Sequence, residues 1–164
     1  ARSRRGRTTS SLQGCVQREY SMSVVDSAIS RLAALALACS SSDVTIKFAP
    51  EKPVDDATTL PLVISHIISG QGVASNSTTL QFEPVIAVDF HFSRISLRQA
   101  YTEINAVVPA YMNRLAGDPT LSGSVDTIQF PVTYEVTPAD WDKVTTQMLR
   151  FSVSVKTLET PVST

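Results

Sequence analysis

The chain has 164 residues, of which 43% are hydrophobic and 18% are charged, and its formal net charge is -1. A chain of this length forms one domain by default and is long enough to bury a substantial core. Two cysteines, Cys15 and Cys39, are too few for a disulfide framework, which indicates a reducing compartment. The longest apolar run, 32–39, is far shorter than the roughly 20 residues of a membrane span. Composition therefore excludes membrane, collagen-like, disulfide-stapled and wholly disordered classes.

Charge is unevenly distributed along the chain. Residues 1–21 carry five arginines against one glutamate, a net of +4, whereas the remaining 143 residues carry 9 basic and 14 acidic side chains, a net of -5. We therefore divide the chain into a basic N-terminal arm, 1–21, and a single domain, 22–164. The arm's candidate contacts to DNA phosphates or to an acidic surface of a neighbouring subunit are Arg2, Arg4, Arg5 and Arg7. A solvated tail is the alternative. No apolar segment directly follows the first arginines, so we expect no secretion signal.

The first half of the domain shows one helical segment followed by segments with strand patterns. Apolar residues at helical spacing predict a helix over 24–39, opened by a capping box of Ser23 and Asp26. Alternating residues predict a strand over 43–49, followed by a loop over 50–59. Two β-branched segments, 60–69 and 78–93, are joined by a glycine-containing connection and predict a long antiparallel hairpin. Pro84 indicates a bulge or an edge position in the second of these strands.

The second half begins with the strongest helical periodicity of the chain, over 97–115, and Ser96 is placed to cap its start. Pro109 lies inside this segment and predicts a kink. A strand is predicted over 125–136 with an interruption at Pro131, and a last strand over 148–157. Residues 137–140 have the sequence of a capping box, which predicts a short helix that carries Trp141. The expected fold is α+β, with a mainly antiparallel sheet, a long hairpin, two main helices packed on one face and a short helix before the last strand.

Residues suited to catalysis or metal binding are few. His66 and His91 are the two histidines, one in each strand of the predicted hairpin, and Asp89 shares a face with His91. Such a group fits an acid–base pair or a zinc site, but without a supporting motif it fits hydrogen-bonded strand residues better. Cys39 lies on the apolar stripe of the first helix and is predicted to be a small core residue. No phosphate-binding or nucleophile motif is present. We therefore expect no catalytic residue, no metal site, no cofactor and no enzymatic activity.

The predicted hairpin is apolar on both faces over parts of its length. Two helices on one side of a sheet cannot cover both faces of such a hairpin. An uncovered apolar strand tends to pair with a strand of another chain. We therefore predict self-association through the hairpin. The candidate inter-subunit residues are Leu62, Ile64, Ile67, Val85, Val88 and Phe90. The alternative is a hairpin sandwiched within the chain's own core.

Element order and several segments of the chain resemble the tail terminator proteins of long-tailed bacteriophages. The segments are 24–39, 85–92 (VIAVDFHF), 97–115 with 125–128, and 151–157 (FSVSVKT), and the resemblance covers roughly residues 22–158. It implies a structural virion protein that forms a hexameric ring on the last ring of the tail tube. Such a ring stops polymerisation of the tube and joins the tail to the DNA-filled head.

The resemblance also implies partners and a location. The partners are other copies of the chain, the tail tube protein, a head–tail connector protein and passing genomic DNA bound without sequence specificity, with no membrane involved. The location is the head-proximal end of the tail in the virion, after synthesis in the host cytoplasm.

Three other readings of the sequence remain open. A tail tube subunit, or another head–tail connector, would also form rings, but a tube subunit stacks them whereas a terminator stops at one. A nucleic-acid-binding module would use the basic arm and lose affinity steeply with salt, although the acidic remainder of the chain disfavours it. A small metal-dependent enzyme would use Asp89 and His91, and would lose activity in a His91→Ala variant.

Overall fold

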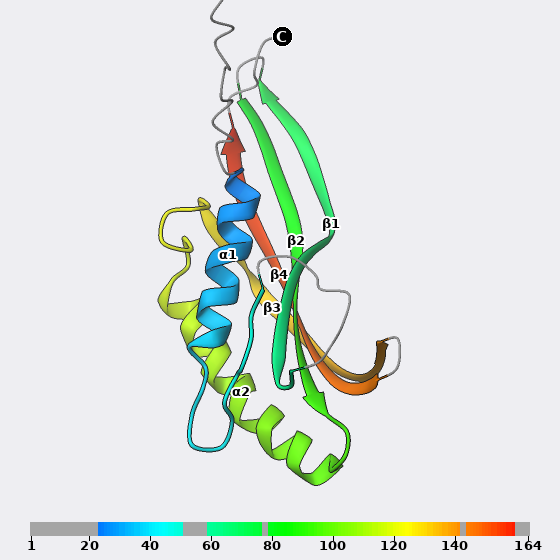
Figure 1. Cartoon of the computed structure of the whole chain (residues 1–164). Helices are drawn as coiled ribbons and strands as arrows, with labels where there is room; N and C mark the ends of the chain where they lie inside the picture. Colours follow the sequence, from blue (N-terminus) through cyan, green and yellow to red (C-terminus); the bar gives the residue numbers. More distant parts are fainter. Residues whose placement is uncertain (1–22, 51–58, 77–78, 142–143, 160–164) are drawn as a thin grey trace, which may run out of the picture.

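The computed structural model describes residues 23–50, 59–76, 79–141 and 144–159, and these form an α+β fold around one four-stranded sheet (Figure 1). The elements are α1 (Val24–Leu37), β1 (Leu62–Asn76), β2 (Thr79–Ser93), α2 (Leu97–Gly117), β3 (Thr127–Trp141) and β4 (Val144–Glu159). None of the helices in this described part of the chain is long and apolar enough to cross a membrane. The predicted basic arm lies outside the described residues.

The sheet is antiparallel throughout, with the strand order β1-β2-β4-β3. Helix α2 connects β2 to β3, and β4 then returns between these two strands. Both helices pack on the same face of the sheet (Figure 1). The predicted α+β class, the long hairpin of β1 and β2 and the two helices on one face are therefore confirmed.

The two helices begin where the sequence places capping serines. The Ser23 hydroxyl accepts a hydrogen bond from the Asp26 backbone N–H at 3.1 Å, and the Ser96 hydroxyl accepts one from the N–H of Gln99 at 3.3 Å. A serine at this position satisfies an N–H that has no partner within the helix. Helix α2 continues through Pro109 to Gly117.

The core lies between the helices and the inner face of the sheet. Phe90 of β2 contacts the rings of Tyr111 and Phe151 edge-on, at centroid distances of 5.3 and 5.8 Å. The Tyr111 hydroxyl donates to the Leu32 carbonyl of α1 at 3.3 Å, so the one polar atom of this ring is paired. Because all four residues are buried, the two helices and the two central strands share a single aromatic core.

At one end of the sheet, the curled strands β3 and β4 cover the outer face of β1. Strands β3 and β4 curl toward their shared turn (Figure 1), and Trp141 packs against Leu62 and Ile64 of β1. Leu62 and Ile64 therefore form a second, smaller apolar cluster on the side away from the helices. The half of the hairpin near these residues is buried on both faces, as in the alternative reading of the sequence.

Two predicted elements are wrong. Residues 43–49 do not form a strand of the sheet, since their backbone joins β1 only through a bridge between Phe48 and Leu62. Their alternation arises because Val44 and Ile46 are buried in the helix-side core. The short helix before the last strand is also absent, since 137–141 pair with β4 as the end of β3. Pairing along a whole strand supplies more backbone hydrogen bonds than one short helix would, so the capping pattern is overridden.

The predicted connection at 70–77 is mostly strand as well. β1 runs to Asn76, and its register against β2 shifts at Ile68, next to the pair formed by Gly70 and Pro84. The bulge predicted from Pro84 therefore exists on the partner strand, although β2 is an interior strand and not an edge. The predicted interruption at Pro131 is confirmed, because the register of β3 against β4 shifts between Gln129 and Thr133.

Candidate functional site

The polar residues singled out in the sequence meet on the outer face of the sheet. Asp89 of β2 is buried, with 4% of its side chain exposed, and it receives two hydrogen bonds from the Arg150 guanidinium of β4, at 2.7 and 2.8 Å. His66 of β1 lies beside them, with Nδ1 4.0 Å from the nearer carboxylate oxygen of Asp89. The hydrogen bond to Asp89 raises the pKa of Arg150 above its ordinary value. This carboxylate is thus neutralised by a bidentate ion pair within the chain.

His91 occupies the neighbouring position on the same face. Its Nδ1 lies 2.8 Å from the Thr146 hydroxyl, and its ring packs on Trp141 at a centroid distance of 4.9 Å. Burial lowers the pKa of His91, because the charged form loses its hydration, and the nearby Asp89 carboxylate opposes this effect only in part. Among the described residues, no group of three or more histidine, cysteine, aspartate or glutamate side chains is arranged to hold a metal ion. The arrangement is that of a hydrogen-bonded strand histidine beside an ion pair.

Stability is expected to depend on the protonation of His91. A histidine whose pKa is lower in the folded than in the unfolded chain binds more protons when unfolded, so the free energy of unfolding falls as the pH drops below about 6.5. One proton contributes a slope of at most about 1.4 kcal/mol per pH unit. Urea unfolding at pH 7.5, 6.5 and 5.5 measures this slope. His91→Asn removes the titrating group and is expected to flatten the curve, whereas the control His66→Asn keeps it. An unchanged slope in His91→Asn contradicts the prediction.

Cys39 is confirmed as a core residue. Its thiol is buried and donates to the Leu35 carbonyl one turn earlier, at 3.3 Å. Burial raises the pKa of the Cys39 thiol to about 11, so almost none of it is thiolate near neutral pH. Cys39 is therefore inert, and Cys15 lies outside the described residues.

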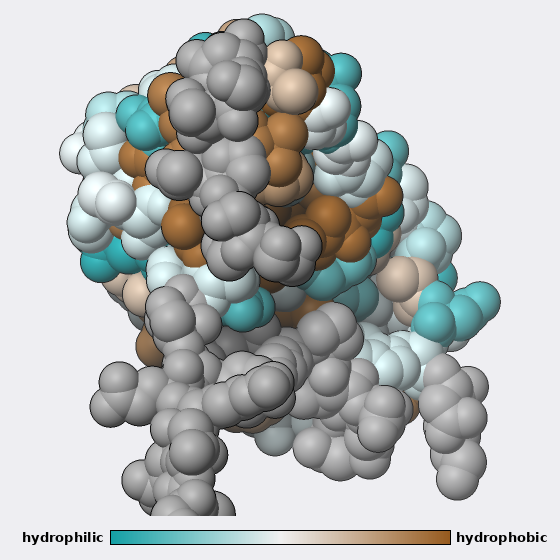
Figure 2. All heavy atoms as spheres, turned by 90° about the horizontal axis from the view of Figure 1, so that it is seen from above, coloured by the Kyte–Doolittle hydropathy of each residue, from teal (hydrophilic) through white to brown (hydrophobic). Residues whose placement is uncertain are grey.

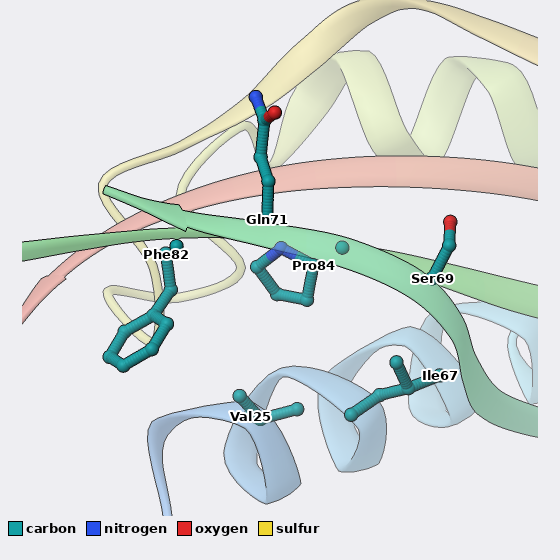
Figure 3. Close-up of a pocket in the computed structure, with 8 residues that line it drawn as sticks. Val25, Ile67, Ser69, Gln71, Phe82 and Pro84 are labelled. Atoms are coloured by element: carbon teal, nitrogen blue, oxygen red, sulfur yellow. The ribbon is translucent and has the colours of Figure 1, made fainter.

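The other half of the hairpin, toward its tip, is open on both faces. On the helix side, Gly70 and Gly72 form the floor of a groove of about 400 Å³, whose walls are Phe82, Pro84, Val25 and Ile67 (Figure 3). A Cβ on Gly70 would lie 3.0 Å from the Cα of Pro84, so glycine permits this close approach. Hydrophobic residues also gather on the face seen from above, at this end of the molecule (Figure 2).

The opposite face of the hairpin tip is polar. The Glu83 carboxylate of β2 accepts hydrogen bonds from the side-chain amides of Gln71, across the strand pair, and of Gln81. These hydrogen bonds lower the pKa of Glu83, and the bond from Gln71 has the largest effect. Glu83 therefore stays charged over a wider pH range. The tip of the hairpin is thus apolar toward the helices and mainly polar on the other side, where Val73 adds an exposed apolar side chain.

The candidate inter-subunit residues fall into two groups. Ile67 is exposed and Val85 is half-buried, so both remain near a surface. The other four are packed inside the chain and cannot contact a partner, which corrects the prediction: Leu62, Ile64, Val88 and Phe90. The physical reason is that the curled end of β3, through Trp141, covers one face of this half of the hairpin and the helices cover the other.

The exposed apolar residues lie further along β1 than the sequence indicated. Ile67, Ile68 and Val73 have 50%, 43% and 55% of their surface exposed. Ile67 and Ile68 are neighbours in sequence and are both exposed because the register shift lies at this point. The sequence signal that could have located Ile68 and Val73 is the pair of glycines between them, which weakens the case for a buried strand. The candidate arginines Arg2, Arg4, Arg5 and Arg7 lie outside the described residues.

The chain was also compared with known proteins. Neither the protein-family models nor the curated proteins give a match to this sequence.

Proposed function

We propose that this chain is a structural virion protein that assembles into a ring, caps the tail tube of a long-tailed bacteriophage and joins the tail to the head connector. The observation that carries the proposal is the exposed outer half of β1, where Ile67, Ile68 and Val73 lie on an edge strand. An edge strand that exposes large apolar residues and carries no charged side chain favours pairing with another protein chain. The resemblance of the chain to tail terminator proteins supplies the identity of that assembly.

The proposed mechanism is occlusion. A ring that binds the last ring of the tube covers the surface on which the next tube subunits would polymerise, and its other side offers a different surface to the connector. No bond is made or broken, so the activity needs no catalytic residue and no cofactor. The buried ion pair of Asp89 and Arg150 acts in this proposal only by holding β2 and β4 together.

The basic arm has a separate role in this proposal. Arg2, Arg4, Arg5 and Arg7 contact the phosphates of passing DNA, or an acidic surface on the neighbouring subunit or the connector. Phosphate contacts of this kind carry no sequence information, which suits a protein through whose ring any part of the genome passes.

The experiment combines solution mass with capture by tail tubes. Light scattering and negative-stain images of the purified chain are expected to give one closed ring of about six copies that does not lengthen with concentration. Added to polymerising tube subunits, the ring is expected to bind tube ends and to stop elongation. Extended tubes formed by the chain alone would instead identify a tube subunit. Tubes that neither recruit the chain nor stop growing in its presence would refute the proposal.

A further inference from the structure

The two edges of the sheet differ in how well they are protected against pairing. Within the described residues, the outer side of β1 is joined only at its start, by the bridge between Leu62 and Phe48. Its two bonds run from Lys47 N–H to the Pro61 carbonyl and from Val63 N–H to the Phe48 carbonyl. The fifteen residues of β1 include no lysine, arginine, aspartate, glutamate or proline. Charges and prolines are the usual features that keep an edge strand from pairing with another chain. β1 has neither charges nor prolines and exposes three large apolar residues, and the feature that interrupts this part of the strand is the bulge at Ile68.

The other edge strand, β3, is blocked at both ends and open in the middle. Pro131 lies at its register shift and Pro138 near its end, and neither has an N–H to donate. Between them, the six residues 132–137 contain no proline. On this strand Phe130 and Tyr134 each have about half of their surface exposed. The open part of β3 is comparable in length to the exposed part of β1 from Ile67 to Val73.

Strand direction makes these two edges compatible. The four strands alternate in direction across the sheet order β1-β2-β4-β3, so β1 and β3 run antiparallel to each other. When two copies are placed side by side in the same orientation, β1 of one copy meets β3 of the next as an antiparallel pair. The pair between two copies would therefore have the same antiparallel hydrogen-bond pattern as every strand pair within the sheet.

Charge also permits the contact. The open part of β3 carries one charged residue, Glu135, which lies opposite Arg150 of β4 in its own sheet. β1 has no acidic residue, so Glu135 meets no like charge from a neighbour's β1. Like charges directly opposite each other would destabilise a strand pair.

We infer that β1 of one copy pairs with β3 of a second copy, so that the sheet continues from subunit to subunit. The inference rests on the proposed ring-forming function and names the contact that builds the ring. The contact is head-to-tail, because the two surfaces differ, and repetition of such a contact closes into a ring when the rotation between subunits allows it. Ile67, on the helix side of β1, and Tyr134, whose ring contacts the core residue Phe151, then lie on the same face of the continuous sheet.

The test uses full-length variants that block one edge each. Ile68→Lys/Val73→Lys places two charges on β1, and Phe130→Lys/Tyr134→Lys places two on β3. The matched control is Ile95→Lys, which adds a charge at a fully exposed isoleucine outside the sheet. Circular dichroism and thermal melting check that each variant is folded. Light scattering after gel filtration then gives the mass of each chain over a range of concentrations.

The expected masses are specific to a head-to-tail contact. The wild-type chain and Ile95→Lys form the multi-subunit species, and each edge-blocked variant is a monomer. An equal mixture of the two blocked variants forms a dimer and nothing larger, because one intact β1 meets one intact β3. A mixture that stays monomeric, or a blocked variant that keeps the wild-type mass, overturns the inference.

Two further outcomes overturn the contact and leave the proposed function to its own test. One is dimerisation of the β3-blocked variant by itself, which means that β1 pairs with β1. The other is a wild-type chain that stays monomeric up to about 1 mM. Capture of the wild-type chain by tail tubes is measured separately, so a chain that caps tubes without these mass changes refutes only the contact.

Discussion

Replacing Arg150 by alanine is expected to lower the free energy of unfolding by about 2–4 kcal/mol. The reason lies in what the substitution leaves behind. Asp89 is almost fully buried, and two hydrogen bonds from Arg150 hold its charge. Without the guanidinium, the buried carboxylate loses its charge partner and both hydrogen bonds, which costs free energy. Urea unfolding at pH 7 measures the loss.

A double-mutant cycle of Asp89→Asn, Arg150→Gln and the combined variant separates the pair from the other effects of each substitution. Asp89→Asn/Arg150→Gln removes both charges and keeps groups that can hydrogen-bond, so it is expected to be more stable than Arg150→Ala. Glu83→Gln is the matched control, because it removes a half-buried carboxylate of the same strand that is bonded by amide groups and not by a guanidinium, and it is expected to change stability little. A loss in Arg150→Ala no larger than that in Glu83→Gln contradicts the assigned role.

Replacing Phe90 by alanine is expected to cost about 3–5 kcal/mol. The ring is fully buried and contacts the rings of both Tyr111 and Phe151 edge-on, so its removal leaves a cavity between β2, β4 and α2. The neighbouring rings belong to different elements and cannot all move to fill the space. The midpoint of urea unfolding measures the loss, and an unchanged slope of the transition shows that the fold is retained.

The control for this substitution is the same residue type at an exposed position. Phe48→Ala removes a ring that is about half exposed and leaves the backbone bridge to β1 in place, so we expect a change within about 0.5 kcal/mol. Phe90→Leu keeps most of the buried volume and is expected to fall between the two. Equal effects of Phe90→Ala and Phe48→Ala would contradict the position of Phe90 at the centre of the core.

The grouping of Asp89, His66 and His91 on one face of the hairpin could be predicted from the sequence. Antiparallel strands alternate their side chains with a period of two, so residues at 89 and 91 share a face and a residue on the paired strand lies across from them. What the sequence could not supply was the partner of the carboxylate. Arg150 lies 61 positions further along the chain, and its approach to Asp89 depends on β4 entering the sheet beside β2.

The surface available to a partner was the least predictable part. The sequence indicated that the apolar hairpin would expose Leu62, Ile64, Val88 and Phe90. In the structure, other parts of the same chain cover both faces of the hairpin at these residues. The curled ends of β3 and β4 cover the face away from the helices, and no local pattern in the sequence predicts this curl. The surface that remains open starts at the bulge, at Ile68, and continues to Val73, which lies where the sequence indicated a connection.

The sequence by itself determined the α+β class, both long helices with their capping serines, and the hairpin of β-branched strands. Each of these follows from local periodicity or from a side chain that bonds a neighbouring backbone group. Only the tertiary structure decided that 137–141 extend a strand, that β4 lies between β2 and β3, and which part of β1 is left uncovered. These outcomes depend on backbone pairing and packing between residues far apart in the chain, and such long-range contacts override local preference when the two disagree.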